Sequence, residues 1–117
     1  MVEKVTGIGG VFIRSRDPEA LAKWYQTHLG LETGMSVWSQ PAGPTVFAPF
    51  RQESDYFPAR QQVMLNFRVA DMTAMTAQLA AAGIEVETRA EWDEPEIGRF
   101  ARIHDPEGNA IELWEPA

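Results

Sequence analysis

The chain contains no cysteine and only two histidines among its 117 residues. It therefore has no disulfide bond, no thiolate ligand for a metal and no cysteine nucleophile. Basic residues are also scarce, because 10 lysines and arginines are outnumbered by 17 aspartates and glutamates, which gives a net charge of −7. An acidic chain of this kind is a poor partner for nucleic acid or for an anionic membrane surface.

Long hydrophobic runs are missing as well. No stretch approaches the about 18 apolar residues that a membrane-spanning helix needs, and the start, MVEKVTGIGG, does not resemble a signal peptide. The content of 44% hydrophobic and 23% charged residues is that of an ordinary folded domain. We therefore expect one cytoplasmic domain over residues 1–117, long enough to form a core without covalent links.

Two helices with similar ends are predicted. The first begins after Asp17, an N-cap residue followed by a proline at the first helical position, and it ends at Gly30. The second begins after Asp71 and ends at Gly83. Glycine is the residue that most often ends a helix in the left-handed conformation. These matching signals indicate that one structural unit occurs twice.

Strand-like runs flank both helices in the same order. The candidates are residues 10–14, 36–40 and 45–48 in the first half, and 63–69, 98–104 and 110–114 in the second half. We predict that one strand, one helix and two or three strands form a module that is used twice.

The module boundaries follow from these runs. Module one covers about 5–50, a polar hinge covers 51–61, and module two covers about 62–116. The second module is longer, and its extra residues are expected in an acidic loop over 87–99. Residues 85–99 hold six acidic and two basic residues, so −4 of the net charge lies in this one segment.

Alternation along each strand predicts which side chains face the helices. The inward set is Val11, Ile13, Val63, Leu65, Phe67, Val69, Ala101, Ile103, Ile111 and Leu113. The opposite face, with nearby aromatic residues, gives the predicted ligand-binding set of Phe12, Arg14, Trp38, Phe47, Met64, Asn66, Arg68, Phe100, Arg102, His104 and Trp114. Such a mixed face fits a small-molecule cleft, and it fits a dimer face or a salt-bridged sheet surface equally well.

Several motifs give the chain a resemblance to a known family. They are Arg14 to Pro18 leading to Trp24-Tyr25 and Leu29-Gly30-Leu31, the run Val69-Ala70-Asp71, and the segment HDPEGNAIELWEP at 104–116. Together they resemble the vicinal oxygen chelate superfamily, which includes glyoxalase I, extradiol dioxygenases, and fosfomycin and bleomycin resistance proteins. The resemblance implies an α+β fold of two tandem βαβββ modules whose sheets curve around a cleft.

The resemblance also identifies four positions that hold metal ligands in the metal-dependent members. Here they are Gly10, Thr45, Met64 and Glu112, and of these only Glu112 offers a hard oxygen ligand. We therefore predict no cofactor. If a metal binds, Glu112 with His104 is the remaining candidate pair.

Glu112 has two further interpretations. It is a catalytic base or a ligand-gripping carboxylate, or it forms an ion pair with Arg14, Arg68 or Arg102. The three arginines on one face favour a carboxylate or phosphate on the ligand, whatever the total charge of the chain.

Three functions remain open from the sequence. The favoured one is a metal-independent protein that binds an aromatic or amphipathic molecule, as bleomycin resistance proteins do by sequestration. The second is a lyase or dioxygenase of glyoxalase type that uses Glu112, with or without a metal. The third is a dimeric interaction module with a vestigial cleft, and a homodimer is expected in any case.

Overall fold

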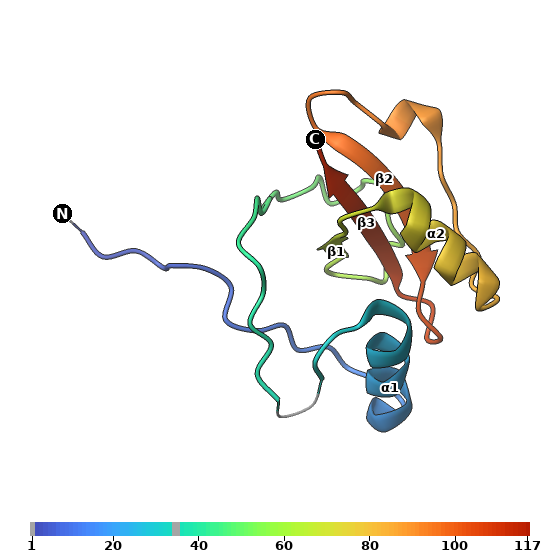
Figure 1. The fold of residues 1–117 in the computed structure, drawn as a ribbon. Coiled ribbons are helices and arrows are strands. Elements are labelled where there is room, and N and C mark those ends of the chain that lie inside the picture. Colours follow the sequence, from blue (N-terminus) through green and yellow to red (C-terminus); the bar gives the residue numbers. More distant parts are fainter. Residues whose placement is uncertain (1, 34–35) are drawn as a thin grey trace.

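The computed structural model describes residues 2–33 and 36–117. Its helices and strands, in chain order, are α1 (Pro18–Leu29), β1 (Leu65–Arg68), α2 (Met72–Ala81), the short 3-10 helix η1 (Ala90–Trp92), β2 (Gly98–His104) and β3 (Ala110–Pro116). Figure 1 shows the three strands side by side with both helices near them, while the N-terminal segment runs away from this body. The fold is a small α+β fold.

Both predicted helices are confirmed, together with their caps. Asp17 accepts a hydrogen bond from the amide of Ala20 at 3.2 Å, and Asp71 accepts one from Ala74 at 3.0 Å. Gly30 and Gly83 follow the helices with φ values of 72° and 80°, in the left-handed region that only glycine adopts readily. No helix among the described residues is long and apolar enough to cross a membrane.

The sheet has the order β1-β3-β2, with β3 at its centre. β3 runs parallel to β1 and antiparallel to β2, so that Asn66, Glu112 and Arg102 lie side by side across the three strands. The strand predicted over 98–104 is confirmed, the last strand continues to Pro116, and the strand predicted over 63–69 is shorter. Between α2 and β2 the chain makes two isolated bridges, from Glu87 to Arg102 and from Glu94 to Gly98, with η1 between them. The loop predicted over 87–99 therefore ends where β2 begins, at Gly98.

One face of the sheet forms the hydrophobic core with both helices. The fully buried members of this core are Leu21, Tyr25, Met72, Leu79, Ala101, Ile103, Ile111 and Leu113. The inward residues predicted for β2 and β3 are thus confirmed. Their alternate neighbours, among them Arg102 and Glu112, therefore lie on the opposite face, which we call the Glu112 face.

α1 is attached to this sheet through the turn that joins β2 to β3. Asp105 is 4% exposed and accepts hydrogen bonds from the Tyr25 hydroxyl at 2.8 Å, the Asn109 side-chain amide at 2.7 Å and two backbone amides. Glu107 accepts a hydrogen bond from Ser15 Oγ at 2.5 Å, just before α1. The buried carboxylate and the hydrogen bonds of this turn therefore make it a docking point for the first helix of the chain.

The first half of the chain differs from the prediction. Residues 10–14, 36–40 and 45–48, which were expected to be strands, form no strand in the structure. Val11 and Ile13 are 55% and 47% exposed where contact with α1 was expected, and Val63 is 61% exposed. A strand becomes stable through a neighbouring strand and a covered face, and these segments have neither. The two tandem modules are therefore not confirmed: α1 is followed by one unit of β1, α2, β2 and β3.

Candidate functional site

Glu112 lies at the centre of the Glu112 face and is held from two sides. It is 9% exposed, on the middle strand of the sheet. The side-chain amide of Asn66 on β1 donates to Glu112 Oε1 at 2.7 Å, and the hydroxyl of Tyr56 donates to Glu112 Oε2. Both carboxylate oxygens thus accept a hydrogen bond, which compensates for the burial of the charge.

The ion pair predicted for Glu112 is wrong. Within the described part of the chain, the salt bridge is that between Arg89 and Glu87, and none of the three predicted arginines reaches Glu112. Arg68 turns instead to the loop at 41–45, where it donates to the carbonyls of Pro44 at 2.7 Å and Pro41 at 2.9 Å. The segment 41–45 pairs with no strand among the described residues, so the Arg68 guanidinium provides hydrogen bonds for its carbonyl oxygens.

Arg102 lies between two aromatic rings beside Glu112. Its guanidinium carbon is 4.9 Å from the ring centre of Tyr56 and 5.8 Å from that of Trp92, within the range of cation–π attraction. One Nη donates to the Tyr56 carbonyl at 2.9 Å. The Nε of Arg102 is buried and has no hydrogen-bond partner among the described residues. An unpaired buried donor costs free energy, so this guanidinium keeps one hydrogen-bonding group unsatisfied there.

Aromatic residues border this polar cluster on the same face. Phe100 and Trp114 stack with parallel rings, 1° apart in angle and 6.1 Å between centres. The indole N–H of Trp114 donates to the carbonyl of Ile97 at 2.9 Å, which fixes the ring. Two stacked aromatic rings, of which that of Trp114 is 8% exposed, therefore lie next to a carboxylate, a phenol and a guanidinium.

The structure gathers part of the predicted binding set. Asn66, Phe100, Arg102 and Trp114 lie with Glu112 on this face, through the register of the three strands. Met64 is half-buried just before β1.

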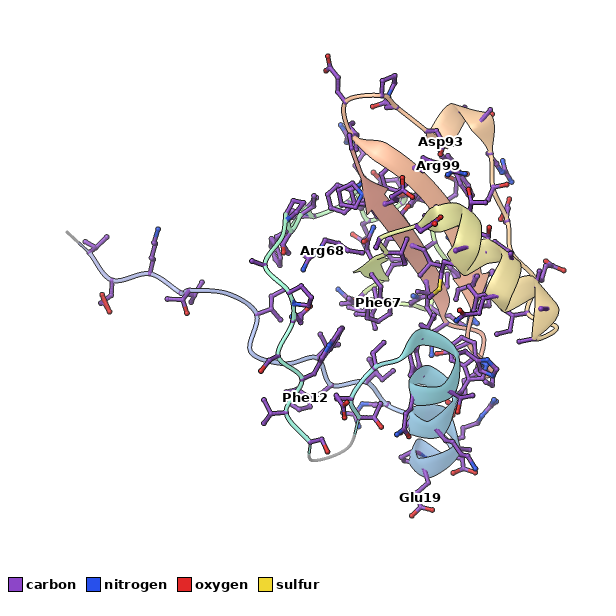
Figure 2. The ribbon with its side chains drawn as sticks, in the orientation of Figure 1. Phe12, Glu19, Phe67, Arg68, Asp93 and Arg99 are labelled. Carbon is purple, nitrogen blue, oxygen red and sulfur yellow. The ribbon has the colours of Figure 1, made fainter. Side chains whose placement is uncertain are left out.

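The remaining predicted residues lie elsewhere. Phe12, Arg14 and Phe47 are exposed on the extended segments, and Figure 2 shows Phe12 away from the sheet. Trp38 lies on the other side of β1, with its ring 6.4 Å from that of Phe67. His104 is exposed at the end of β2, where Asp105, not the histidine, organises the turn.

Tyr56 is the residue of this cluster that the sequence analysis missed. It lies in the polar segment 51–61, and its ring and that of Phe57 are each 5.6 Å from the ring of Phe50. The adjacent aromatic residues Tyr56 and Phe57 within a polar stretch were the available signal. Trp92, in the acidic loop, is the second contributor from outside the strands.

The donors near Glu112 do not form the oxygen-rich set of a divalent cation site. Within the described residues no group of three or more histidine, aspartate and glutamate side chains is close enough to hold a metal. The neighbours of Glu112 are a phenol and an amide that both donate hydrogen bonds to it, and a cation at the carboxylate must displace them.

Both tyrosines of the chain donate to a buried carboxylate. Burial, followed by the hydrogen bond to Glu112, raises the pKa of Tyr56 to about 12, and burial with the Asp105 contact raises the pKa of Tyr25 above its usual value. A raised phenol pKa means that folding favours the protonated form. This contribution to stability is complete below pH 10, the ordinary tyrosine pKa, and for Tyr56 it disappears as the pH rises to about 12.

This arrangement predicts an unusual tyrosine titration. Near pH 10 we expect little tyrosinate absorbance from the folded protein, whereas about half of the tyrosine is ionised in urea. Glu112→Gln lowers the Tyr56 pKa toward its ordinary value and leaves Tyr25 unchanged. Titration of the ultraviolet absorbance checks this, and two tyrosines ionising near pH 10 in the folded protein contradict it.

A separate hollow of about 390 Å³ lies on the α2 side of the molecule, between Thr73, Arg89 and Arg99. Its cations are already engaged, because Arg89 pairs with Glu87 at 2.5 Å and Arg99 donates to the Thr73 hydroxyl at 3.1 Å. Neither Glu112 nor Tyr56 lines this hollow. The chemistry of the Glu112 face is therefore the better candidate, although neither Glu112 nor Tyr56 lines a hollow of this kind.

Comparison with known proteins gives the family of the chain. The family model described as a glyoxalase-like domain matches residues 10–114. A search of curated proteins gives no match.

Solved structures give a likeness in fold. TnmS3, an antibiotic binding protein from Streptomyces sp. CB03234, is 23% identical over 98% of this chain and 99% of its own, with a TM-score of 0.65. A glyoxalase/bleomycin resistance protein from Streptomyces sp. CB03234 is 33% identical over 46% of each chain, with a TM-score of 0.40 that supports no argument about fold. Because the family model covers nearly the whole chain, this protein belongs to the glyoxalase-like domain family of the vicinal oxygen chelate superfamily.

Proposed function

We propose that the protein binds a small organic molecule on the Glu112 face, without a divalent metal. The ligand is aromatic or amphipathic and carries an oxygen acceptor, preferably a carboxylate. The observation that carries this proposal is Arg102, a guanidinium held between two aromatic rings with a buried Nε that has no partner in the part of the chain that the structure describes.

Each part of the ligand has a matching group. An anionic oxygen pairs with Arg102, because a charge-assisted hydrogen bond satisfies a donor that the chain leaves open. An aromatic ring lies against the stacked pair of Phe100 and Trp114. Glu112 keeps Tyr56 and Asn66 in place through their hydrogen bonds to its carboxylate. Its negative charge also repels a ligand whose anionic group would lie beside Glu112 and not beside Arg102.

The related fold of TnmS3 supports binding as the activity, since that protein binds an antibiotic. Sequestration also explains why Glu112 keeps both oxygens occupied. A lyase or dioxygenase of glyoxalase type requires at least one of these oxygens to be released for a substrate or a metal. We therefore place binding ahead of catalysis.

A ligand panel tests the proposal by thermal shift. Aromatic carboxylates are expected to raise the melting temperature of the wild type, and their neutral amides to raise it less, by mass action on the folded state. Arg102→Ala should remove the preference for the acid. Arg99→Ala is the matched control, because Arg99 is on the same strand but turns to Thr73 on α2. Equal shifts for acid and amide in the wild type contradict the role of Arg102.

Metal analysis separates binding from the metal-dependent alternative. Protein purified without chelator is expected to hold manganese, iron, nickel and zinc far below one equivalent. A stoichiometric metal that is lost in Glu112→Ala favours the enzyme and contradicts a metal-free site. If neither ligands nor metals bind, the interaction module gains support.

A further inference from the structure

Arg102 and Glu112 are neighbours across β2 and β3, yet within the described part of the chain no salt bridge joins them. Each of them contacts Tyr56 instead. The Tyr56 hydroxyl donates to Glu112 Oε2, and the Tyr56 carbonyl accepts a hydrogen bond from an Arg102 Nη at 2.9 Å. The ring of Tyr56 lies 4.9 Å from the guanidinium carbon. One residue thus supplies a donor to the carboxylate, and an acceptor and an aromatic ring to the guanidinium.

Tyr56 belongs to residues 51–61, a segment without helix or strand that we call the strap. The strap is anchored at its end, because the Gln61 side chain donates to the carbonyl of Ala110 at 2.8 Å and accepts from the amide of Ala110 at 3.0 Å. Among the described residues, the hydrogen bonds from 51–57 to the sheet are those of Tyr56 alone. Release of Tyr56 therefore frees this part of the strap from the sheet, while the anchor at Gln61 remains.

The contacts of Tyr56 match those that the proposed ligand makes, group for group. Its ring lies at Arg102, and an oxygen acceptor meets the guanidinium. Burial and the bond to Glu112 raise the pKa of Tyr56 to about 12, so its phenol is protonated and donates at neutral pH. Glu112 is 9% exposed, and a buried carboxylate that loses a hydrogen bond is strongly disfavoured. A ligand that takes this place must therefore bring its own donor.

We propose that Tyr56 occupies the place of the ligand in the free protein, and that the ligand that displaces it is a phenol with a carboxylate on a short chain. The ligand hydroxyl replaces the Tyr56 hydroxyl at Glu112, and its carboxylate replaces the Tyr56 carbonyl at Arg102. Glu112 keeps both oxygens hydrogen-bonded in both states, Oε1 to Asn66 and Oε2 to a phenol. This inference rests on the proposed function, because it names the class of ligand for the same face.

The test uses para-hydroxyphenylpropanoate, which reproduces a tyrosine side chain with a carboxylate at the position of the backbone carbonyl. Phenylpropanoate, without the hydroxyl, is the comparison compound. We expect the hydroxylated compound to bind Tyr56→Ala at least about tenfold more tightly than the wild type, in which the closed strap lowers the fraction of open molecules. It should also bind this variant about tenfold more tightly than phenylpropanoate does, because a hydrogen bond to a charged group is gained. Titration calorimetry measures both differences.

Two further variants control this experiment. Tyr56→Ala/Glu112→Gln should lose most of the preference for the hydroxylated compound. Phe57→Ala is the matched control, because it removes another half-buried ring from the strap, one that lies 5.6 Å from the ring of Phe50. It should bind the compound as the wild type does. The same gain in Phe57→Ala as in Tyr56→Ala overturns the proposal, and so does equal affinity of Tyr56→Ala for the two compounds.

A measurement on the wild type covers the case in which Tyr56→Ala does not fold. The chain has two tyrosines, so isotope-labelled tyrosine rings give two sets of nuclear magnetic resonance signals, and Tyr56→Phe assigns them. Saturating para-hydroxyphenylpropanoate is expected to move the Tyr56 signals toward those of free tyrosine. The Tyr25 signals should stay unchanged, since that hydroxyl is bonded to Asp105. Tyr56 signals that do not move at saturation overturn the displacement.

These outcomes separate failure of this inference from failure of the proposed function. If both compounds bind the wild type with equal affinity and the Tyr56 signals stay in place, aromatic carboxylates bind beside a closed strap. The proposed function then stands and the displacement of Tyr56 is wrong. If neither compound binds a folded Tyr56→Ala, the inference is overturned, whatever other aromatic carboxylates bind to the wild type.

Discussion

Asp105→Ala is expected to destabilise the fold by about 3–5 kcal/mol, a large part of the total stability of a small domain. The buried carboxylate accepts hydrogen bonds from the Tyr25 hydroxyl, from the Asn109 side chain and from the amides of residues 107 and 109. Removing it leaves these donors without a partner in a region that water does not reach. Urea unfolding at fixed protein concentration measures the change.

The control for this prediction is Asp93→Ala. Asp93 is exposed and accepts one hydrogen bond, from the amide of Phe100 at 3.1 Å, so its loss should cost less than about 1 kcal/mol. Asp105→Asn should fall between the two, since one acceptor oxygen is kept. Equal unfolding curves for Asp105→Ala and Asp93→Ala show that the turn does not hold α1.

Leu113→Ala is expected to cost about 2–5 kcal/mol through the cavity that it leaves. Leu113 is fully buried on the central strand of the sheet, and it belongs to the core cluster that contains residues of both helices. The same change also loosens β3 next to Glu112. We therefore expect weaker binding of any ligand of the Glu112 face in addition to the lower free energy of unfolding.

Val63→Ala is the matched control for this change. The sequence places Val63 on the same inward face, but it is 61% exposed in the structure, so a cost within about 0.5 kcal/mol is expected. Denaturant titration of both variants decides between these outcomes. A loss at Val63 as large as that at Leu113 means that the first strand of the sheet is longer and more buried than described.

Sequence reasoning succeeded at both helices and at the last two strands. The helix caps at Asp17 and Asp71, the turn at Asp105 to Gly108 and the alternation of Ala101 and Ile103 are all local signals. Each depends on residues a few positions apart, and each is satisfied by nearby backbone. The caps and the turn are formed by residues close in sequence, whereas the alternation in β2 succeeded because β3 follows it directly and pairs with it.

The first half failed for the opposite reason. Alternation in residues 10–14 and 45–48 indicates strands, but a strand is stable only when another strand and a packed face are present. The pattern does not say whether that partner is in the same chain. These segments pair with no strand within the described residues, and Phe12 and Phe47 on them are exposed.

The site shows the same division. Asn66, Arg102 and Glu112 could be placed on one face from alternation, and the register confirms this. Their partners could not be foreseen, because Tyr56 is 56 positions from Glu112 and lies in a segment without periodicity. An aromatic ring near both groups redirects Arg102 from an ion pair to a cation–π contact, which only the packed structure reveals.

The sequence by itself determined the helices, the turn before β3, the family resemblance and the absence of thiol chemistry, because these depend on composition and on short-range spacing. Only the tertiary structure decided that Glu112 binds Tyr56 and Asn66, that Arg102 keeps an unpaired donor, and that α1 docks on Asp105. Contacts between distant segments depend on how the whole chain buries its apolar surface, and the pattern of one segment does not contain that information.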